Sequence, residues 1–322
     1  MRIALLALVL VSCTPVVAPS APPSPTGIAA SPVPTSSAPA SWRRVAAIPT
    51  PRSEVAAAVF RGVIYVVGGF GGGDVVETYV ADSWSAAPRY PLAVDHAMAA
   101  GVDTAGTPGL YVFGGNVNGA AVARAFRFVG EQGWREIASM PGPRSQGAAV
   151  AIGSRIFIVG GAQSGRLVSP TYVYDTAADR WTTVASIPTP RDHLAAAAVG
   201  GRVCAIGGRR LSMLQNLASF ECYNPAADAW QSMPDAPTAR GGLGAATVRD
   251  RLFVAGGEQP LGTFKEVDIF DPATARWTRG PDLPNARHGL GVVALGSTLY
   301  VMSGGPTPGG SQTAVCEALD VR

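Results

Sequence analysis

Six tryptophans recur along the chain at intervals of 42 to 50 residues, and a proline follows each of them seven residues later. The tryptophans are Trp42, Trp84, Trp134, Trp181, Trp230 and Trp277. An arginine follows ten residues after five of them, while the second unit has Val94 at that position. A period of this length over six copies restricts the chain to a repeat architecture in which neighbouring units bury one another.

Each repeat contains the signals of four short β-strands. In the first repeat, an Ala/Val-rich run at Val55–Phe60 precedes an apolar run at Val63–Val67, which ends in the doublet Gly68-Gly69. Later strands end at an aromatic residue followed by Asp or Asn, as at Tyr174-Asp175, and the fourth strand contains the tryptophan. The chain has 39 glycines and 27 prolines, which argues against a helical bundle. We therefore expect an all-β protein.

The glycine doublet, the aromatic-Asp pair and the tryptophan at these spacings resemble the kelch repeat, and the resemblance covers residues 41–322. It implies a six-bladed β-propeller with four-stranded blades. The chain enters this region with Trp42, a fourth-strand residue, and leaves it after Val315–Val321, which matches a third strand. We therefore expect the N-terminal strand to complete the last blade and to close the ring, which removes exposed sheet edges.

The first 40 residues predict a targeting signal and a tether. Ile3–Val11 is an apolar run that is too short to cross a bilayer, so residues 1–12 are interpreted as a signal peptide. The run ends in Leu10-Val11-Ser12-Cys13, which resembles the lipobox of bacterial lipoproteins. That resemblance implies lipidation at Cys13 and an exported protein anchored to the bacterial envelope, at the outer membrane or cell surface. An ordinary secretory peptide with an accidental cysteine is the alternative, and inner versus outer membrane stays open.

Residues 13–40 comprise this cysteine and a segment rich in Pro, Ala and Ser without charge or aromatic residues. Its prolines disfavour helices and central strands, so we expect a semi-rigid tether. The net charge is +3 and no Lys/Arg block occurs, so we expect no nucleic-acid partner. We expect a monomer without a cofactor.

The kelch resemblance implies that the loops between blades and the loops after the doublets share one face, which commonly binds ligands. The position twelve residues after each tryptophan is expected to face the channel mouth there, and the position before it lies beside it. The predicted ligand-binding residues are Arg52, Glu54, His96, Arg144, Gln146, Arg191, His193, Arg240, Arg287 and His288. For the five arginines, a structural role between blades is the stronger alternative.

The three histidines all lie in these two rings of positions. His96 and His193 each follow an aspartate, but adjacent strand residues point to opposite faces, so no His–Asp dyad is predicted. His96, His193 and His288 with Glu54 could supply metal ligands, but they come from different blades across a wide ring. We therefore predict no metal site. The sequence leaves open whether Cys204 and Cys222 form a disulfide, and Cys316 is expected to be a buried thiol.

The function expected from these features is a ligand- or protein-binding scaffold that acts through one propeller face, with the ligand unidentified. The alternative is a sugar-modifying enzyme similar to the N-acetylneuraminate epimerases, which are exported six-bladed kelch propellers; Glu54, His96 or His193 would then supply acid–base catalysis. A copper enzyme of the galactose-oxidase type is less favoured, because that family has seven blades and a Tyr–Cys crosslink.

Overall fold

The computed structural model describes Leu10, Ser12, 41–103 and 105–322. Cys13 and the tether lie outside the described residues, so the lipidation and tether predictions stay predictions. By its internal contacts the chain divides into Met1–Pro39 and Ala40–Arg322, and all strands of the described residues belong to the second unit. Among the described residues, no helix combines the length and apolar character needed to cross a membrane.

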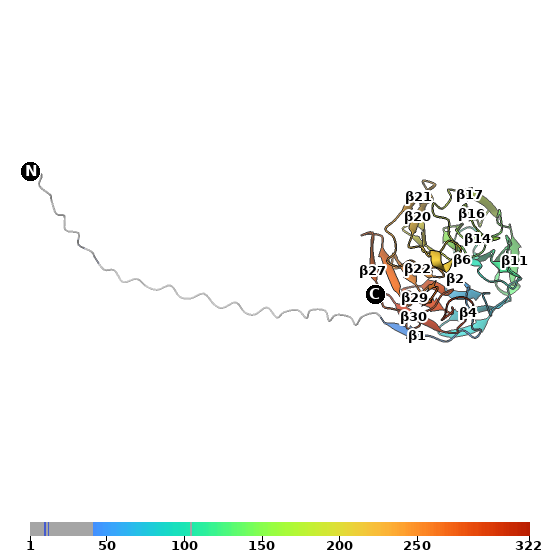
Figure 1. Ribbon diagram of the computed structural model, residues 1–322, viewed down its shortest axis with the longest axis horizontal. Helices are drawn as coiled ribbons and strands as arrows, with labels where there is room; N and C mark the ends of the chain where they lie inside the picture. Colours follow the sequence, from blue (N-terminus) through green and yellow to red (C-terminus); the bar gives the residue numbers. More distant parts are fainter. Residues whose placement is uncertain (1–9, 11, 13–40, 104) are drawn as a thin grey trace, which may run out of the picture. The chain divides into compact units, whose positions relative to one another are not determined.

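Six four-stranded antiparallel sheets are arranged in a ring, as the sequence predicted (Figure 1). The innermost strands are β2 (Ala56–Phe60), β6 (Met98–Val102), β12 (Ala148–Ile152), β18 (Ala195–Val199), β22 (Gly244–Val248) and β28 (Gly291–Leu295). The second strands are β3 (Val63–Val67), β7 (Gly109–Phe113), β13 (Arg155–Val159), β19 (Arg202–Ile206), β23 (Arg251–Ala255) and β29 (Thr298–Met302).

The outer half of each blade has the same regularity. The third strands are β4 (Val76–Val80), β10 (Ala125–Phe128), β16 (Thr171–Asp175), β20 (Phe220–Asn224), β26 (Val267–Asp271) and β30 (Cys316–Asp320). The fourth strands are β5 (Ser83–Ala86), β11 (Trp134–Ile137), β17 (Arg180–Val184), β21 (Ala229–Ser232), β27 (Arg276–Arg279) and, from the start of the chain, β1 (Trp42–Arg44). Three small hairpins are added, β8–β9 (Asn116–Val117, Ala120–Ala121), β14–β15 (Ala162–Gln163, Arg166–Leu167) and β24–β25 (Glu258–Gln259, Gly262–Thr263).

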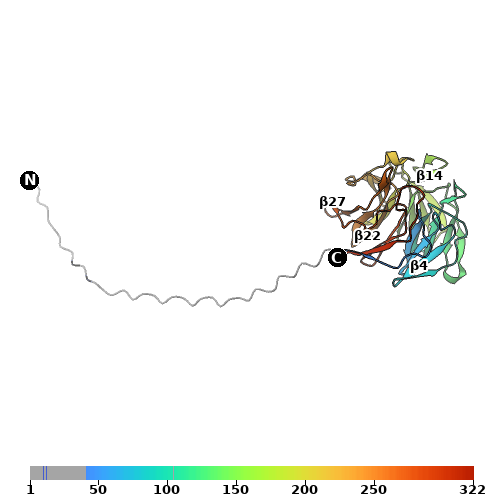
Figure 2. The ribbon, with the colours of Figure 1, turned by 60° about the horizontal axis from the view of Figure 1, so that its bottom comes forward.

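The ring is closed by strands from the two ends of the folded region. β1 pairs with β30, with Trp42 opposite Leu319 and Arg44 opposite Glu317. The innermost strands contact one another in sequence around the ring, including β2 with β28, and the turned view shows the blades in succession (Figure 2). These strands are rich in alanine and glycine, since they approach closely near the axis. A Cβ at Gly101, for example, would collide with the carbonyl of Val59 on the neighbouring blade.

All six tryptophans bond to the preceding blade, which explains why each repeat contains one. Each indole N–H donates to a main-chain carbonyl at 2.8–2.9 Å, and for five of them this acceptor lies 38–46 residues earlier in the chain. The indole of Trp42 donates to Pro281, so the first tryptophan of the chain reaches the last repeat. The six indole rings are half-buried, and a large ring that packs against a sheet while its N–H is satisfied is the arrangement expected of a tryptophan with one apolar side and one polar group.

The glycine doublets connect the blades near the axis. The N–H of the second glycine donates to the main-chain carbonyl of the next blade at the consensus arginine or its equivalent; for example, Gly161 donates to Arg191 at 2.8 Å. Both glycines have positive φ, and a Cβ at Gly69 would collide with the carbonyl of Ser53. In the sixth blade Ser303 takes the first position at φ 59°, and Gly304 donates to Arg52 at 2.9 Å. The doublet is therefore a contact between blades.

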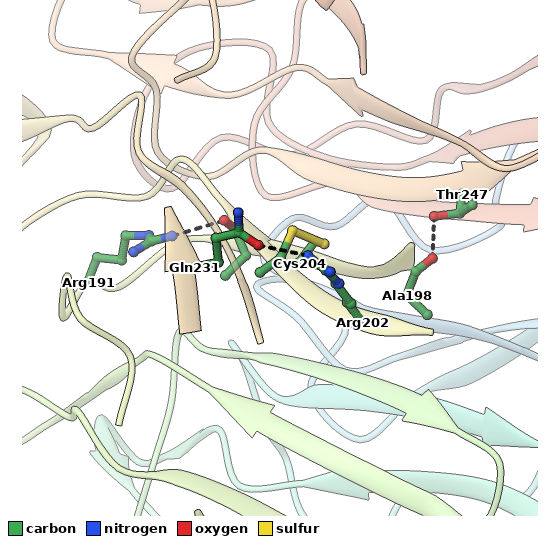
Figure 3. The surroundings of a disulfide bond; sticks show 8 residues. Arg191, Ala198, Arg202, Cys204, Gln231 and Thr247 are labelled. Atoms are coloured by element: carbon green, nitrogen blue, oxygen red, sulfur yellow. Dashed lines mark hydrogen bonds between the residues drawn. A yellow bond between two sulfur atoms is a disulfide. The ribbon is translucent and has the colours of Figure 1, made fainter. Parts of the chain in front are cut away.

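Cys204 and Cys222 form a disulfide between β19 and β20, which settles the question that the sequence left open (Figure 3). The two residues lie directly opposite each other in the antiparallel register, and Figure 3 also shows Arg202 bonded to Gln231 of the fourth strand. The bond from the hydroxyl of Thr247 to the carbonyl of Ala198, at 2.7 Å, connects this blade to the next. Cys316 is a buried free thiol, as predicted.

The consensus arginines are fully buried inside the blades, which corrects the prediction that they contact a ligand. They are Arg52, Arg144, Arg191, Arg240 and Arg287, and each has 0% exposure. Four of them pair with a buried carboxylate of the third strand, and the Arg191–Glu221 pair spans 2.5 Å. Arg144 instead donates to the carbonyl of Pro170 and lies over the ring of Tyr172. Because the guanidinium groups have no exposed surface, their role is structural.

Replacing Arg191 with methionine is predicted to lower the free energy of unfolding by about 3–5 kcal/mol, because Glu221 is left as a buried charge without a partner of opposite charge. Adding Glu221→Gln should restore part of that loss. The control Arg202→Met removes an arginine with an exposed hydrogen bond and should change the free energy by about 0.5 kcal/mol or less. Urea unfolding measures all three, and equal losses for Arg191→Met and Arg202→Met would contradict the buried-pair account.

Candidate functional site

The loops between blades and the loops after the doublets meet on one face of the propeller. In every blade, the residue eleven positions after the tryptophan forms a β-bridge with the loop after that blade's doublet. The pairs are Ser53 with Phe70, Asp95 with Asn116, Ser145 with Ala162, Asp192 with Arg209, Gly241 with Glu258 and His288 with Gly305. The side chains of both sets of loops are therefore brought to the same end of the channel.

The residues twelve positions after the tryptophans form a ring around that end of the channel. All six have left-handed φ values between 50° and 65°: Glu54, His96, Gln146, His193, Gly242 and Gly289. Main-chain hydrogen bonds run from one to the next, for example from the N–H of His193 to the carbonyl of Gln146 at 2.8 Å. The six residues line a cavity of about 90 Å³. Five such bonds thereby link all six blades in a row beneath the site.

His96 and His193 each bond to the aspartate that precedes them. Nδ1 of His96 donates to Oδ1 of Asp95 and Nδ1 of His193 donates to Oδ2 of Asp192, each at 2.6 Å. The expectation that neighbouring side chains point apart is wrong here, because the histidines are left-handed rather than extended. Each imidazole is consequently held with Nε2 toward the channel, and the two Nε2 atoms lie 3.2 Å apart.

The Glu54 carboxylate lies between two of the histidines. Its Oε2 is 3.2 Å from Nε2 of His96, and its Oε1 accepts from Nδ1 of His288 at 3.0 Å. Gly289 makes this possible, because a Cβ at that position would collide with the carboxylate. The expectation that the histidines lie too far apart across the ring to converge is therefore wrong: Glu54 brings together side chains from three blades.

Arg209 and Glu258 complete the cluster from the loops after the doublets. Arg209 donates through Nη2 to Nε2 of His193 and through Nη1 to Oε1 of Glu258, both at 2.8 Å. Oε2 of Glu258 accepts from the N–H of Gly309 and lies 3.5 Å from Nδ1 of His288. Sequence reasoning missed Glu258. The register of the repeat could have identified Glu258, because it forms a β-bridge with Gly241, the residue directly before the ring position Gly242.

The environment moves the pKa values of the two neighbouring histidines in opposite directions. Burial disfavours the charged form of His96, but the Glu54 carboxylate and the bond to Asp95 outweigh it and raise its pKa. Burial lowers the pKa of His193, and the contributions of Asp192 and Glu54 do not offset it. Burial also raises the pKa of Glu54, but the nearby His96 and the bond from His288 outweigh burial and lower it.

A cleft of about 480 Å³ opens beside this cluster. Its walls are the β8–β9 and β14–β15 hairpins and the loop at Arg209 and Leu211, and its floor includes Gln146, Asp192 and His193. The volume lies within the range of small-molecule sites. Within the described part of the chain, the Gln146 amide makes no hydrogen bond, although the residue lines both the cleft and the channel cavity.

The structure thus gathers Glu54, His96, Gln146, His193 and His288 at one face, while the five arginines lie inside the blades. A family model described as the KLHDC2/KLHL20/DRC7 Kelch-repeats domain matches residues 95–305, and one described as the Kelch motif matches residues 51–85. The chain belongs to the kelch-repeat family. No curated protein matches it by sequence.

Among solved structures, this kelch propeller is similar to one titled "Structure of YjhT". The TM-score is 0.74 at 14% sequence identity, and the match covers 84% of this chain and 95% of that chain. At this identity the likeness shows the fold alone. The site of this kelch propeller is therefore interpreted from its own residues.

Gly289→Ala is predicted to destabilise the protein by about 1–3 kcal/mol, because the added methyl group displaces the buried Glu54 carboxylate. Gly296→Ala is the matched control. Gly296 also has positive φ, at 61°, but it has open space around it, so its substitution reports the backbone cost alone. Thermal unfolding of both variants checks the prediction; a loss at Gly289 no larger than that at Gly296 would contradict it.

Proposed function

We propose that this protein is an exported, lipid-anchored kelch propeller that binds a small polar ligand of the carbohydrate class in the cleft beside the histidine cluster. The observation that carries the proposal is the unpartnered amide of Gln146 on the floor of a 480 Å³ cleft. An amide can donate and accept at once, which suits a ring of vicinal hydroxyl groups. Binding by recognition alone needs no further chemistry from the site.

The chemistry of the cleft walls supports a polar ligand. Asn116, Gln163 and Ser164 line it together with Gln146, and Arg209 and His193 contribute polar groups to it. Among the described residues, no Phe, Tyr or Trp side chain lines the cleft. Recognition would therefore rest on hydrogen bonds to polar groups rather than on apolar burial.

The exported location is supported by two features that are independent of the cleft. The apolar run and Cys13 resemble a lipoprotein signal, and the Cys204–Cys222 disulfide is of a kind that persists in oxidising compartments. A lipid at Cys13 followed by a proline-rich segment would hold the propeller at the envelope surface.

Exposed leucines favour a second candidate, a protein-binding scaffold that uses the same loops. Leu211 is 47% exposed, and Leu214 and Leu261 are 84% and 97% exposed. Leu211 lies at the edge of the cleft, whereas Leu261 forms the turn of the β24–β25 hairpin. Exposed apolar side chains on binding loops are a common feature of protein interfaces.

A sugar-modifying enzyme is the third candidate, and the His193–Asp192 pair on the cleft floor favours it. A galactose-oxidase type of site is disfavoured, because the required Tyr–Cys crosslink has no counterpart among the cysteines that the structure describes: Cys204 and Cys222 bond to each other, and Cys316 is buried in the sixth blade.

Thermal unfolding of residues 41–322 against neutral and acidic sugars tests the binding proposal. A ligand at 100 times its Kd should stabilise the protein by about 2.7 kcal/mol. Gln146→Ala should weaken that ligand by about 2- to 10-fold, the loss of one hydrogen bond, and Gln231→Ala on the outer strand should leave it unchanged. A shift with equal affinity in Gln146→Ala would place the ligand elsewhere and contradict the proposal.

The same preparation separates the candidates. Faster interconversion of the anomers of a bound sugar in the presence of the protein would favour the enzyme, and unchanged anomers would favour binding alone. If no sugar shifts the unfolding temperature, the carbohydrate proposal is wrong. The exposed leucines then favour the protein-binding scaffold.

Lipidation is tested by labelling bacterial cells with a palmitate analogue. The full chain should carry the label and sediment with membranes, and Cys13→Ser should be unlabelled. Cys316→Ser is the control, because its buried thiol is not a lipidation site and the label should persist. An unlabelled full chain would contradict the anchor while leaving the cleft proposal intact.

A further inference from the structure

We propose that Glu54, His96 and His193 bind a divalent transition-metal ion of the zinc class at the channel mouth. These three residues come from the first, second and fourth blades, and their ligand atoms all lie within 4.8 Å of one another. The proposal does not depend on a sugar ligand, because it rests on the ring residues rather than on the cleft walls.

The spacing of the ligand atoms fits one coordination sphere. Nε2 of His96 lies 3.2 Å from Oε2 of Glu54 and 3.2 Å from Nε2 of His193. Zinc bonds of about 2.0–2.2 Å in tetrahedral geometry place neighbouring ligand atoms about 3.3 Å apart. The two distances from Nε2 of His96, to Oε2 of Glu54 and to Nε2 of His193, are therefore close to the separation between two ligand atoms of one zinc ion.

The atoms behind the histidines form the outer shell that a metal-binding imidazole needs. Asp95 and Asp192 accept from the two Nδ1 atoms at 2.6 Å, which fixes the ring orientation and directs Nε2 inward. The aspartates are themselves held: Asp95 accepts from the Asn116 amide at 2.9 Å, and Asp192 accepts from the N–H of Leu211 at 2.7 Å. This carboxylate–histidine arrangement occurs twice around one point.

The charges of the cluster also favour a cation. Four carboxylates meet here, those of Glu54, Asp95, Asp192 and Glu258, against the guanidinium of Arg209 and the imidazole of His288. Two imidazoles and one carboxylate make a ligand set that suits zinc and leaves a fourth position open. The cavity lined by the ring residues gives room for water or a ligand at that position.

A second group of potential ligands, Glu54, Glu258 and His288, shares Glu54 with the first but suits a transition metal less well. It offers one imidazole, whose Nε2 already contacts the carbonyl of Thr307 at 3.1 Å. Its Glu258 is bonded to Arg209 and to the N–H of Gly309. The first group is therefore the better candidate for a transition metal, because it offers two Nε2 atoms that face the channel.

Arg209 competes with the ion in this arrangement. Its Nη2 lies 2.8 Å from Nε2 of His193, in the direction in which that atom would bind a metal. Arg209 must therefore turn away from His193 when the ion enters, and its second bond, to Glu258, can persist. The proposal consequently predicts that removing Arg209 tightens metal binding, an effect that general damage to the site would not produce.

Calorimetric titration of chelator-treated residues 41–322 with ZnCl₂ tests the proposal, with Co²⁺ absorption as a second readout of imidazole ligation. One ion per chain should bind, and His96→Gln and His193→Gln should each weaken binding by at least about 100-fold. Asp192→Asn should weaken it by about 10- to 100-fold, as for other outer-shell partners. Arg209→Ala should strengthen it.

The variant His288→Ala distinguishes the two groups, because it removes only a ligand of the second one. It should retain Zn²⁺ binding, and thermal unfolding should confirm that every variant is folded. The proposal is overturned if the unsubstituted protein binds no Zn²⁺, or if binding survives in folded His96→Gln and His193→Gln. Loss of binding in His288→Ala with retention in His193→Gln would overturn it as well. Sugar binding measured with chelator present is a separate result, so either proposal can fail alone.

Discussion

Hydrogen bonds to main-chain carbonyls of neighbouring blades are the interaction on which the rest of this structure depends. Near the axis, the second glycine of each doublet donates to the carbonyl of the next blade, and further out each tryptophan donates to the preceding one. Both contacts are present at the closure, from Gly304 to Arg52 and from Trp42 to Pro281. Because every blade is fixed to its neighbours at two radii, the loops on the face have a rigid base.

That base explains how a polar cluster can be assembled from residues distant in sequence. The left-handed backbone at the ring positions turns His96 and His193 toward their own aspartates, and the glycine at 289 leaves space for Glu54. Neither feature involves the strands themselves. The blades and the site thus depend on different residues of the repeat, so the repeat can be kept while the ring side chains vary.

The fold could be predicted from the sequence because the same pattern of strands, glycine doublet and tryptophan recurs six times. Trp42 without preceding strands and Val315–Val321 without a following tryptophan were sufficient to predict the closure. The ring residues could be found for the same reason, because their spacing from each tryptophan fixes their place in the blade. The consensus arginines were assigned partly to the ligand because register alone gives no burial, and burial is what makes them structural.

The side-chain geometry of the site could not be predicted in the same way. Extended backbone separates neighbouring side chains, so Asp192 and His193 were expected to diverge, and only the left-handed φ of His193 brings them together. The convergence of Glu54 with His96 and His193 depends on the actual radius of the ring, for which the sequence has no signal. Glu258 was missed because its role arises from a bridge between loops.

The central claim is that the face carrying the histidine cluster is where this propeller binds a small polar ligand. The most direct measurement is a crystal structure of residues 41–322 soaked with the sugar that stabilises the protein most. The account predicts electron density for the sugar in the cleft, within hydrogen-bonding distance of the Gln146 amide and beside His193. Density on the opposite face or on the outer strands, with the cleft empty, would contradict it.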